Sequence, residues 1–276
     1  MPVHPRNLQP IMLARVVAKL ESIAPLALAE SWDNVGLLAG DLGSSVQRIM
    51  TCLTISRETV REAIDGQAEL IVTHHPLPFK PLQKIVTSSA AGQSLWSLLR
   101  EGIAIYSPHT AWDNAYGGIN ARLAELLSLA DVRPIRKIAN AEAVDPSLGA
   151  GRVGSLAPSR SIAEIVSSLR TMMPSIRATS NQSAEHRVDR VAIVCGSGGS
   201  FVDAARLVDA NLLLTGEATY HQCLEAQASG LAMLMIGHFD SERFAMDLLA
   251  EALAVEFPSL DVWASRNERD SVIEID

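Results

Sequence analysis

The sequence predicts an α/β protein with mainly parallel sheets, and two observations support this fold class, while the length bears on the number of domains. Short apolar runs that are typical of buried strands alternate with segments of helical periodicity over the first ~130 residues. The same alternation resumes after Val188, and it favours parallel sheets because parallel neighbours need a crossover, usually a helix. The chain has 276 residues, which is enough for one large domain or for two lobes of ordinary size.

The first part of the chain opens with a helical stripe over residues 11–23. The turn-rich segment Ser31–Asp41 follows, and we interpret it as a packed connection rather than a functional loop. The apolar runs of this part predict strands at Gln47–Ile55, Leu70–Thr73 and Ile103–Tyr106. The periodic segments predict helices at Arg57–Ile64, at Gly92–Arg100 and after Gly118 as far as Leu127.

The second part repeats the pattern after a weaker stretch that holds a predicted strand at Val153–Leu156 and a helix capped by Ser161. Three predicted strands, each followed by a helix, then cover Val188–Cys195, Asn211–Leu214 and Leu231–Ile236. Short strands are predicted at Val262–Trp263 and Val272–Ile275. The glycine loop Gly196–Ser200 matches neither the Walker A loop nor the dinucleotide motif, so we favour a tight turn over a phosphate-binding loop.

The composition excludes several classes of protein. A formal net charge of −8 and a pI near 5.4 disfavour nucleic-acid binding, which depends on basic side chains, and suit a site that draws in cations. Cys52 and Cys195 lie in apolar runs and are predicted to be buried thiols in a reducing compartment. The first ten residues do not resemble a signal peptide, and no apolar run reaches the ~18–20 residues of a membrane span. We therefore expect a cytoplasmic protein without a membrane partner.

Candidate metal ligands follow the predicted strands. His74 and His75 come directly after Leu70–Thr73, and Asp113 follows the strand that ends at Tyr106. His238 and Glu242 are four residues apart at the start of a helix, which places them on one face. The carboxyl ends of parallel strands meet at one edge of a sheet, so the fold favours a common site. By itself the His-His pair is equally compatible with two polar loop residues.

These five side chains predict a dinuclear site. Three imidazoles and two carboxylates suit Zn, Fe, Mn, Co or Ni, whereas magnesium prefers more oxygen. Five ligands are too many for one catalytic metal with an open position, but they suffice for two divalent ions if one carboxylate bridges. His109 and His221 lie close to the ligand segments, and we expect them either to transfer protons and orient ligands or only to satisfy loops. His4 and His186 are expected at the solvated surface.

Five segments in order resemble the NGG-interacting-factor-three-like family of dinuclear-metal-centre proteins, often described as GTP cyclohydrolase type 2 homologues. They are Ser31–Asp41, Thr73–Pro76, His109–Asp113 with Gly117–Asn120, Gly216–His221 and Gly237–Glu242. The resemblance implies two α/β lobes with a metal cleft between them. We place the lobes at 1–130 and 131–276, and the C-terminal segment either stays with the second lobe or packs back on the first. The resemblance also implies a toroidal homohexamer.

Carried over by motif, the resemblance gives one metal to His74, Asp113 and Glu242. The other metal falls to His75 and His238, with Glu242 bridging the two ions. The family's His-Thr-Asn-Leu-Asp is here His-Thr-Ala-Trp-Asp, which keeps Asp113 but changes the lining of the site.

The leading hypothesis is a metal-dependent hydrolase that uses metal-activated water, with His109 or His221 moving a proton. The implied substrate is a nucleotide or another phosphate-bearing small molecule, as in GTP cyclohydrolase chemistry. The alternative is a non-catalytic metal-binding protein with a regulatory or interaction role. An open coordination position and turnover would distinguish the enzyme from the sensor.

Overall fold

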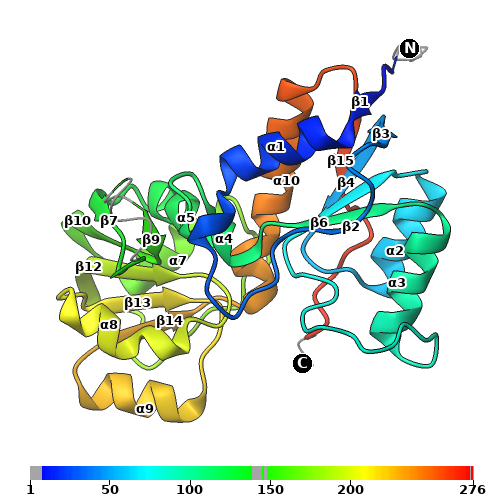
Figure 1. Cartoon of the computed structure of the whole chain (residues 1–276). Helices are drawn as coiled ribbons and strands as arrows, with labels where there is room; N and C mark the ends of the chain where they lie inside the picture. Colours follow the sequence, from blue (N-terminus) through cyan, green and yellow to red (C-terminus); the bar gives the residue numbers. More distant parts are fainter. Residues whose placement is uncertain (1–7, 139–144, 146–147, 274, 276) are drawn as a thin grey trace, which may run out of the picture. The chain divides into compact units, whose positions relative to one another are not determined.

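The computed structural model describes residues 8–138, 145, 148–273 and 275, and it divides the chain into two compact units. The first unit runs up to Ala111 and resumes at Ala245, whereas the second is Trp112–Phe244 (Figure 1). These limits differ from the division at residues 130 and 131 inferred from the sequence. Both crossings fall within helices, α4 (His109–Asn114) and α10 (His238–Glu256), where no composition change marks a boundary.

The first unit contains a five-stranded sheet in the order β15-β4-β5-β6-β2. β15, β4, β5 and β6 are parallel neighbours, and β2 closes the far edge antiparallel to β6. The strands are β2 (Gly36–Ala39), β4 (Arg48–Cys52), β5 (Leu70–Thr73), β6 (Ala104–Ser107) and β15 (Asp261–Ala264). A separate antiparallel pair joins β1 (Ile11–Met12) to β3 (Ser45–Val46). The C-terminal strand β15 is therefore part of the first sheet.

Helices cover both faces of the first sheet. α2 (Arg57–Asp65) and α3 (Ala90–Arg100) bury Val60, Leu95 and Leu98 in one core cluster with Met50 and Ile71 of the strands. α1 (Leu13–Ile23) and the later part of α10 lie on the other face (Figure 1), where Thr51 Oγ1 of β4 donates to the carbonyl of Met246 at 2.8 Å. The short 3-10 helix η1 (Leu26–Leu28) follows α1. The apolar faces of these helices thus pack against the sheet and stabilise it, and the histidines project from its carboxyl edge.

The second unit contains a six-stranded sheet in the order β11-β14-β13-β12-β10-β7. Its centre, β12 to β14, is parallel, whereas β7, β10 and β11 pair antiparallel to their neighbours. The strands are β7 (Ala130–Arg133), β10 (Arg152–Ser161), β11 (Thr179–Ser180), β12 (Arg187–Val194), β13 (Leu212–Thr215) and β14 (Ala232–Met235). A two-stranded pair, β8 (Arg136–Lys137) with β9 (Gly149–Ala150), completes the strands of the described residues. The predicted α/β class is confirmed.

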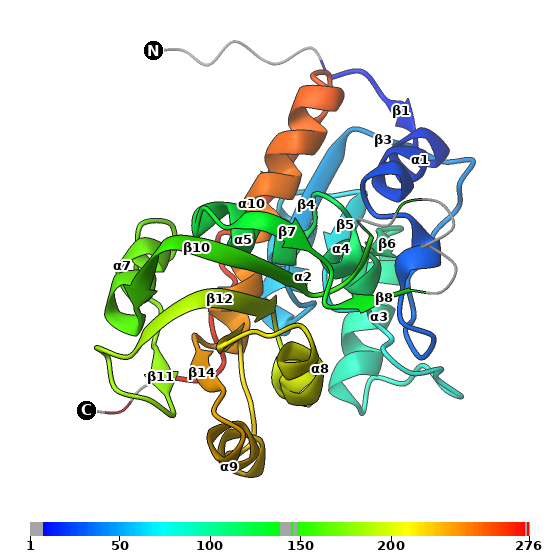
Figure 2. The same cartoon turned by 90° about the vertical axis from the view of Figure 1, so that its left-hand side faces the viewer.

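Helices also pack on the second sheet, and Figure 2 shows them beside its strands. The helical elements of this unit are α5 (Ile119–Leu126), α7 (Ile162–Arg170), η2 (Gly198–Phe201), α8 (Val202–Leu207) and α9 (Tyr220–Ala228). α8 and α9 share a core cluster with the strands through Val202, Ala205 and Ala226. Ser161 begins α7 with a capping box to Glu164, as predicted. The parallel strands β12 to β14 therefore direct their carboxyl ends toward the loops that carry Gly196 and Glu217 and toward His238 at the start of α10.

Three expectations need correction. The strand predicted at Val272–Ile275 does not form at 272, 273 or 275, and residue 274 lies outside the described part of the chain. Gly36–Ala39 is a strand rather than part of a connection, because Leu37 and its neighbours pair with β6. His186, expected at the solvated surface, is partly buried. Asp113 lies on helix α4, and residue 4 lies outside the described residues.

Candidate metal centre

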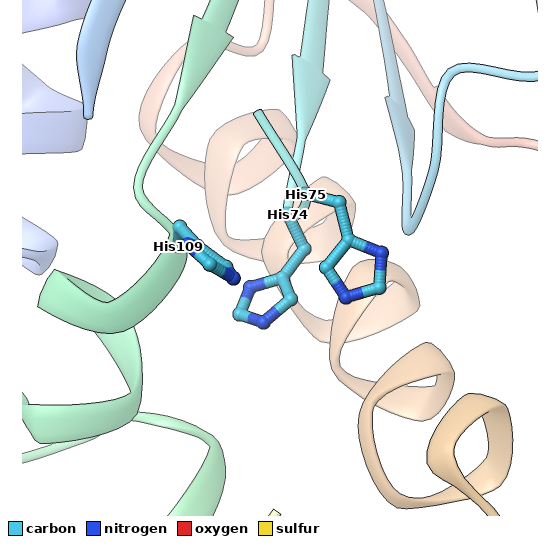
Figure 3. A group of neighbouring side chains, drawn as sticks. All are labelled: His74, His75 and His109. Atoms are coloured by element: carbon cyan, nitrogen blue, oxygen red, sulfur yellow. The ribbon is translucent and has the colours of Figure 1, made fainter. Parts of the chain in front are cut away.

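Three histidines of the first unit converge at the carboxyl end of its sheet (Figure 3). His74 and His75 directly follow β5, and His109 begins α4 just after the parallel neighbour β6. The ring centroids lie 5.2 Å apart for His74 and His75, 5.1 Å for His74 and His109, and 5.7 Å for His75 and His109. Adjacent parallel strands thus bring together residues that are more than 30 positions apart in the sequence.

The imidazoles are close enough to share a metal ion. One ring nitrogen from each of His74, His75 and His109 lies within 4.8 Å of the others. A tetrahedral ion with bonds of about 2.1 Å separates its ligands by about 3.4 Å, so modest side-chain rotation would bring all three nitrogens into range. His74 is 0% exposed, whereas His75 and His109 are partly buried, so the group has one deep and two accessible members.

Hydrogen bonds orient two of these rings. Nδ1 of His109 lies 2.7 Å from Oδ1 of Asp33, and Oδ2 of Asp33 accepts a bond from the backbone N–H of Thr110 at 3.1 Å. Burial acts to raise the pKa of Asp33, but the hydrogen bonds from His109 and Thr110 outweigh it and lower the pKa. An ionised Asp33 keeps the proton on Nδ1, so Nε2 is the ring nitrogen of His109 that carries the lone pair.

Nδ1 of His75 is held in a similar way by Oγ1 of Thr54, at 2.7 Å. Neither orienting group was predicted from the sequence. Asp33 lies in the Ser31–Asp41 segment that we interpreted as a packed connection, and Thr54 lies within the predicted strand Gln47–Ile55, just beyond the end of β4 at Cys52. The density of polar residues next to Trp32 was the available signal for Asp33.

The second unit carries a histidine–carboxylate group at the start of α10. Nε2 of His238 lies 3.2 Å from Oε2 of Glu242, one helical turn later, and Nδ1 of His238 lies 3.1 Å from Oε1 of Glu217. Hydrogen bonding to the Glu242 carboxylate outweighs burial and raises the pKa of His238 to about 9. Glu242 is buried and His238 is partly exposed, so a cation that replaced the shared proton would find both side chains already in place.

Gly196 allows this carboxylate to sit against the backbone. Its φ is +61°, and a Cβ at this position would lie 2.2 Å from Oε1 of Glu242 and 3.4 Å from Nε2 of His238. The backbone N–H of Gly196 also donates to Oγ of Ser241 at 3.0 Å. The glycine loop therefore forms a tight turn against the start of α10, and this close approach accounts for a glycine at position 196.

Asp113 belongs to a different neighbourhood of the second unit. Its Oδ1 accepts a bond from the thiol of Cys195 at 3.2 Å. Burial, reinforced by the charge of Asp113, raises the pKa of Cys195 well above its usual range, so the thiol stays protonated and donates. Cys52 and Cys195 are both buried, as predicted, but Cys195 also positions a candidate ligand.

A buried arginine supports the end of α4 that carries Asp113. Arg152 donates to the carbonyls of Asn114 and Ala115 at 3.2 and 2.6 Å and to those of Gly149 and Gly151 at 2.7 Å each. Burial lowers its pKa to about 10, which leaves the guanidinium charged near neutral pH. This cation fixes the helix end by contacts to backbone rather than to a carboxylate.

The structure groups the predicted residues unit by unit. It brings His74 and His75 together with His109, and it joins His238 to Glu242. His221 is exposed on α9 with its ring 5.8 Å from that of Tyr220, and its proton-transfer role stays a prediction. The division of the five predicted ligands between two ions also stays a prediction.

The fold and these groups define an α/β protein whose clustered histidine and carboxylate side chains could hold a metal ion. The chain belongs to the Duf34/NIF3 (NGG1p interacting factor 3) family, whose sequence profile matches residues 11–271. The resemblance seen in the sequence is thereby confirmed. Among the described residues, no helix has the length and hydrophobicity needed to cross a membrane.

Relatives match most of the chain. A GTP cyclohydrolase 1 type 2 homolog of Clostridium perfringens is 35% identical over 227 residues, covering 82% of this chain and 85% of its own length. NIF3-like protein 1 of Drosophila melanogaster is 33% identical over 271 residues, covering 95% and 89%. The crystal structure of a Bacillus cereus protein related to NIF3 has a TM-score of 0.84 at 22% identity, covering 97% of this chain and 100% of its own, which shows a shared fold.

Proposed function

We propose that this chain is a dinuclear, divalent-metal-dependent hydrolase that acts on a nucleotide-like substrate. The observation that supports it best is the convergence of two predicted ligands, His74 and His75, with His109, the candidate proton-transfer group; one ring nitrogen of each lies within 4.8 Å of the others. The His238–Glu242 pair supplies a second set of metal-binding atoms on one helical turn. The relative of Clostridium perfringens described as a GTP cyclohydrolase 1 type 2 homolog supports a purine nucleotide as the substrate class.

The side chains fit a borderline metal. Imidazole and carboxylate ligands together suit Zn, Fe, Mn, Co or Ni better than Mg. In this proposal the predicted ligands His74, His75, Asp113, His238 and Glu242 hold two ions. A bound divalent ion would supply Lewis acidity and lower the pKa of a water molecule at the site.

The protein's own groups then account for proton movement. Asp33 holds His109 with its Nδ1 proton directed at the carboxylate, so Nε2 can accept a proton from water and return it to a leaving group. Buried Asp33 stabilises the imidazolium form that this transfer creates, as a carboxylate does in other His–Asp pairs. His109 is therefore the proton-transfer residue that the geometry favours over His221.

A metal-binding regulatory protein is the second candidate. The 0% exposure of His74 favours it, because closed coordination by buried ligands is typical of structural metal sites. The predicted toroidal hexamer and cytoplasmic location are compatible with either candidate and stay predictions.

The test is metal content per chain, measured on protein purified without chelator or affinity metal. Glu242→Ala is compared with Glu251→Ala, an exposed carboxylate on the same helix α10. We expect about two ions in the wild type and in Glu251→Ala, and one or none in Glu242→Ala. Equal metal content in all three proteins would refute the site. Metal-loaded protein that hydrolyses no nucleotide or phosphoester would favour the regulatory candidate.

A further inference from the structure

Two large aromatic side chains lie exposed beside the histidine group of the first unit. Trp32 is 60% exposed and Phe79 is 46% exposed. Their ring centroids are 6.0 Å apart, and each lies 6.1 Å from the centroid of His109. Tryptophan usually buries most of its ring in a folded protein, so a largely exposed tryptophan next to the candidate site requires an explanation.

Both aromatics sit on segments that hydrogen bonds hold in place. Asp33, next to Trp32, is anchored to His109 and Thr110. Asn34 donates from Nδ2 to the carbonyl of Pro78 at 2.7 Å, which joins the Trp32 segment to the segment that carries Phe79. The bond that orients His109 therefore also holds the segment that carries Trp32, and the Asn34 bond ties the segment that carries Phe79 to it. A ligand that used these rings would lose little binding free energy to ordering them.

The rings form a corner rather than a slot. Their planes are inclined by 51°, and His109 is nearly perpendicular to both, at 77° to Trp32 and 80° to Phe79. A flat ring needs roughly 7 Å to insert between two parallel rings in van der Waals contact, so nothing fits between Trp32 and Phe79. Both side chains are exposed, so a planar group can stack on the outer face of one ring. The other ring, packed against that ring at a tilt, holds it in position.

We propose that Trp32 and Phe79 form a stacking platform that binds the planar heteroaromatic ring of a ligand, such as a nucleobase, next to His109. The platform rests on the proposed function, because it gives the substrate of the histidine centre its ring-recognition site. Stacking on an aromatic side chain tolerates different bases, since every base has a π face. The platform therefore selects planar heterocycles as a class and leaves the choice among them to other contacts.

The experiment compares two probes on the purified, metal-containing protein by isothermal titration calorimetry. Guanosine 5′-monophosphate carries a planar ring, and ribose 5-phosphate lacks it. We expect the nucleotide to bind more tightly than ribose 5-phosphate. Trp32→Leu should weaken nucleotide binding roughly 5- to 150-fold and leave ribose 5-phosphate binding unchanged, because only the stacking contact is lost. Phe79→Leu should act in the same direction.

Two control variants separate stacking from other effects. Trp32→Phe keeps an aromatic face and should retain most of the nucleotide affinity. Trp96→Leu removes another half-exposed tryptophan, 51% exposed on α3, and should leave binding unchanged. Equal affinity of the wild type and Trp32→Leu for the nucleotide would overturn the platform, and so would the absence of nucleotide binding in the wild type. A drop in molecular mass on Trp32→Leu without nucleotide binding would reassign the surface to contact with a second copy.

Measuring metal content distinguishes a failure of the stacking platform from a failure of the proposed metal site. Metal content is measured on the same samples and should be equal in the wild type, Trp32→Leu and Trp96→Leu. Metal at the expected level with unchanged nucleotide affinity in Trp32→Leu would refute the platform alone. Nucleotide binding that depends on Trp32 in a protein without metal would support the platform and refute the dinuclear hydrolase.

Discussion

Replacing Gly196 with alanine tests how tightly the backbone holds Glu242. Two costs add at this position. The first is the left-handed backbone, with φ at +61°, which costs an L-residue about 1–2 kcal/mol. The second is the new methyl group, which would lie 2.2 Å from Oε1 of Glu242. Because carbon and oxygen need more than ~3 Å, the carboxylate must move by about 1 Å, and a metal site tolerates only about 0.5 Å.

Gly230→Ala provides the matched control within the same unit. Its φ is +77°, but a Cβ there would meet nothing within 4 Å, so it carries the backbone cost without the collision. We expect urea denaturation to show a loss of about 1–2 kcal/mol for Gly230→Ala and about 2–4 kcal/mol for Gly196→Ala. Competition with a chelator should show at least about tenfold weaker metal binding in Gly196→Ala only. Equal destabilisation and equal metal affinity in the two variants would refute the reasoning.

Two further predictions concern the carboxylates of the first unit. Asp33→Asn should slow nucleotide hydrolysis by the metal-loaded protein about 10²- to 10⁴-fold, because His109 loses the carboxylate that orients it, whereas the exposed neighbour Asp41→Asn should not; equal rates would contradict the orienting role. Burial acts to raise the pKa of Glu62, but hydrogen bonds from Arg266, Ser265 and Asn267 outweigh this effect and lower the pKa below 4.5. The ionised carboxylate therefore stabilises the fold above pH ~4.5, and this stabilisation is lost as the pH falls through the folded-state pKa. Glu62→Gln should therefore unfold more easily than the wild type in urea at pH 7, and the difference should disappear in acid as Glu62 becomes protonated in the folded state; a difference that does not change with pH would contradict this role.

Local patterns predicted much of the fold. The strand β5 forms at Leu70–Thr73, as predicted, because a short apolar run ends at His74-His75-Pro76, where proline cannot extend a central strand. α2 and α7 begin at the N-cap residues Ser56 and Ser161, which are recognisable in the sequence because serine is a preferred N-cap. The α/β fold class follows from these strand and helix signals, because alternating strands and helices are compatible with few other arrangements.

The candidate site was only partly predictable. His74 and His75 were found because they follow a strand, and the convergence of His109 followed from neighbouring parallel strands. Asp33 and Thr54 were missed because their contacts, to His109 and His75, depend on tertiary structure. The role of Gly196 against Glu242 also depends on packing between segments 46 residues apart, which no local pattern encodes.

The two limits of the units were hidden for a similar reason. Each falls inside a continuous helix, so neither glycine nor proline marks it. The position of β15 beside β4 joins segments more than 200 residues apart, which hydrophobic periodicity alone cannot reveal.

The pairing of β15 with β4 sets an order for assembly during protein synthesis. All residues of Trp112–Phe244 leave the ribosome before Ala245 and the strands beyond it, although β4 and β5 are made first. The second unit can thus fold while the first still lacks an edge strand and much of α10. Until β15 pairs with it, β4 is an exposed apolar edge strand. Such an edge can pair with another chain during misfolding, and chaperones protect surfaces of this kind. The part of the protein translated first is the last to be completed.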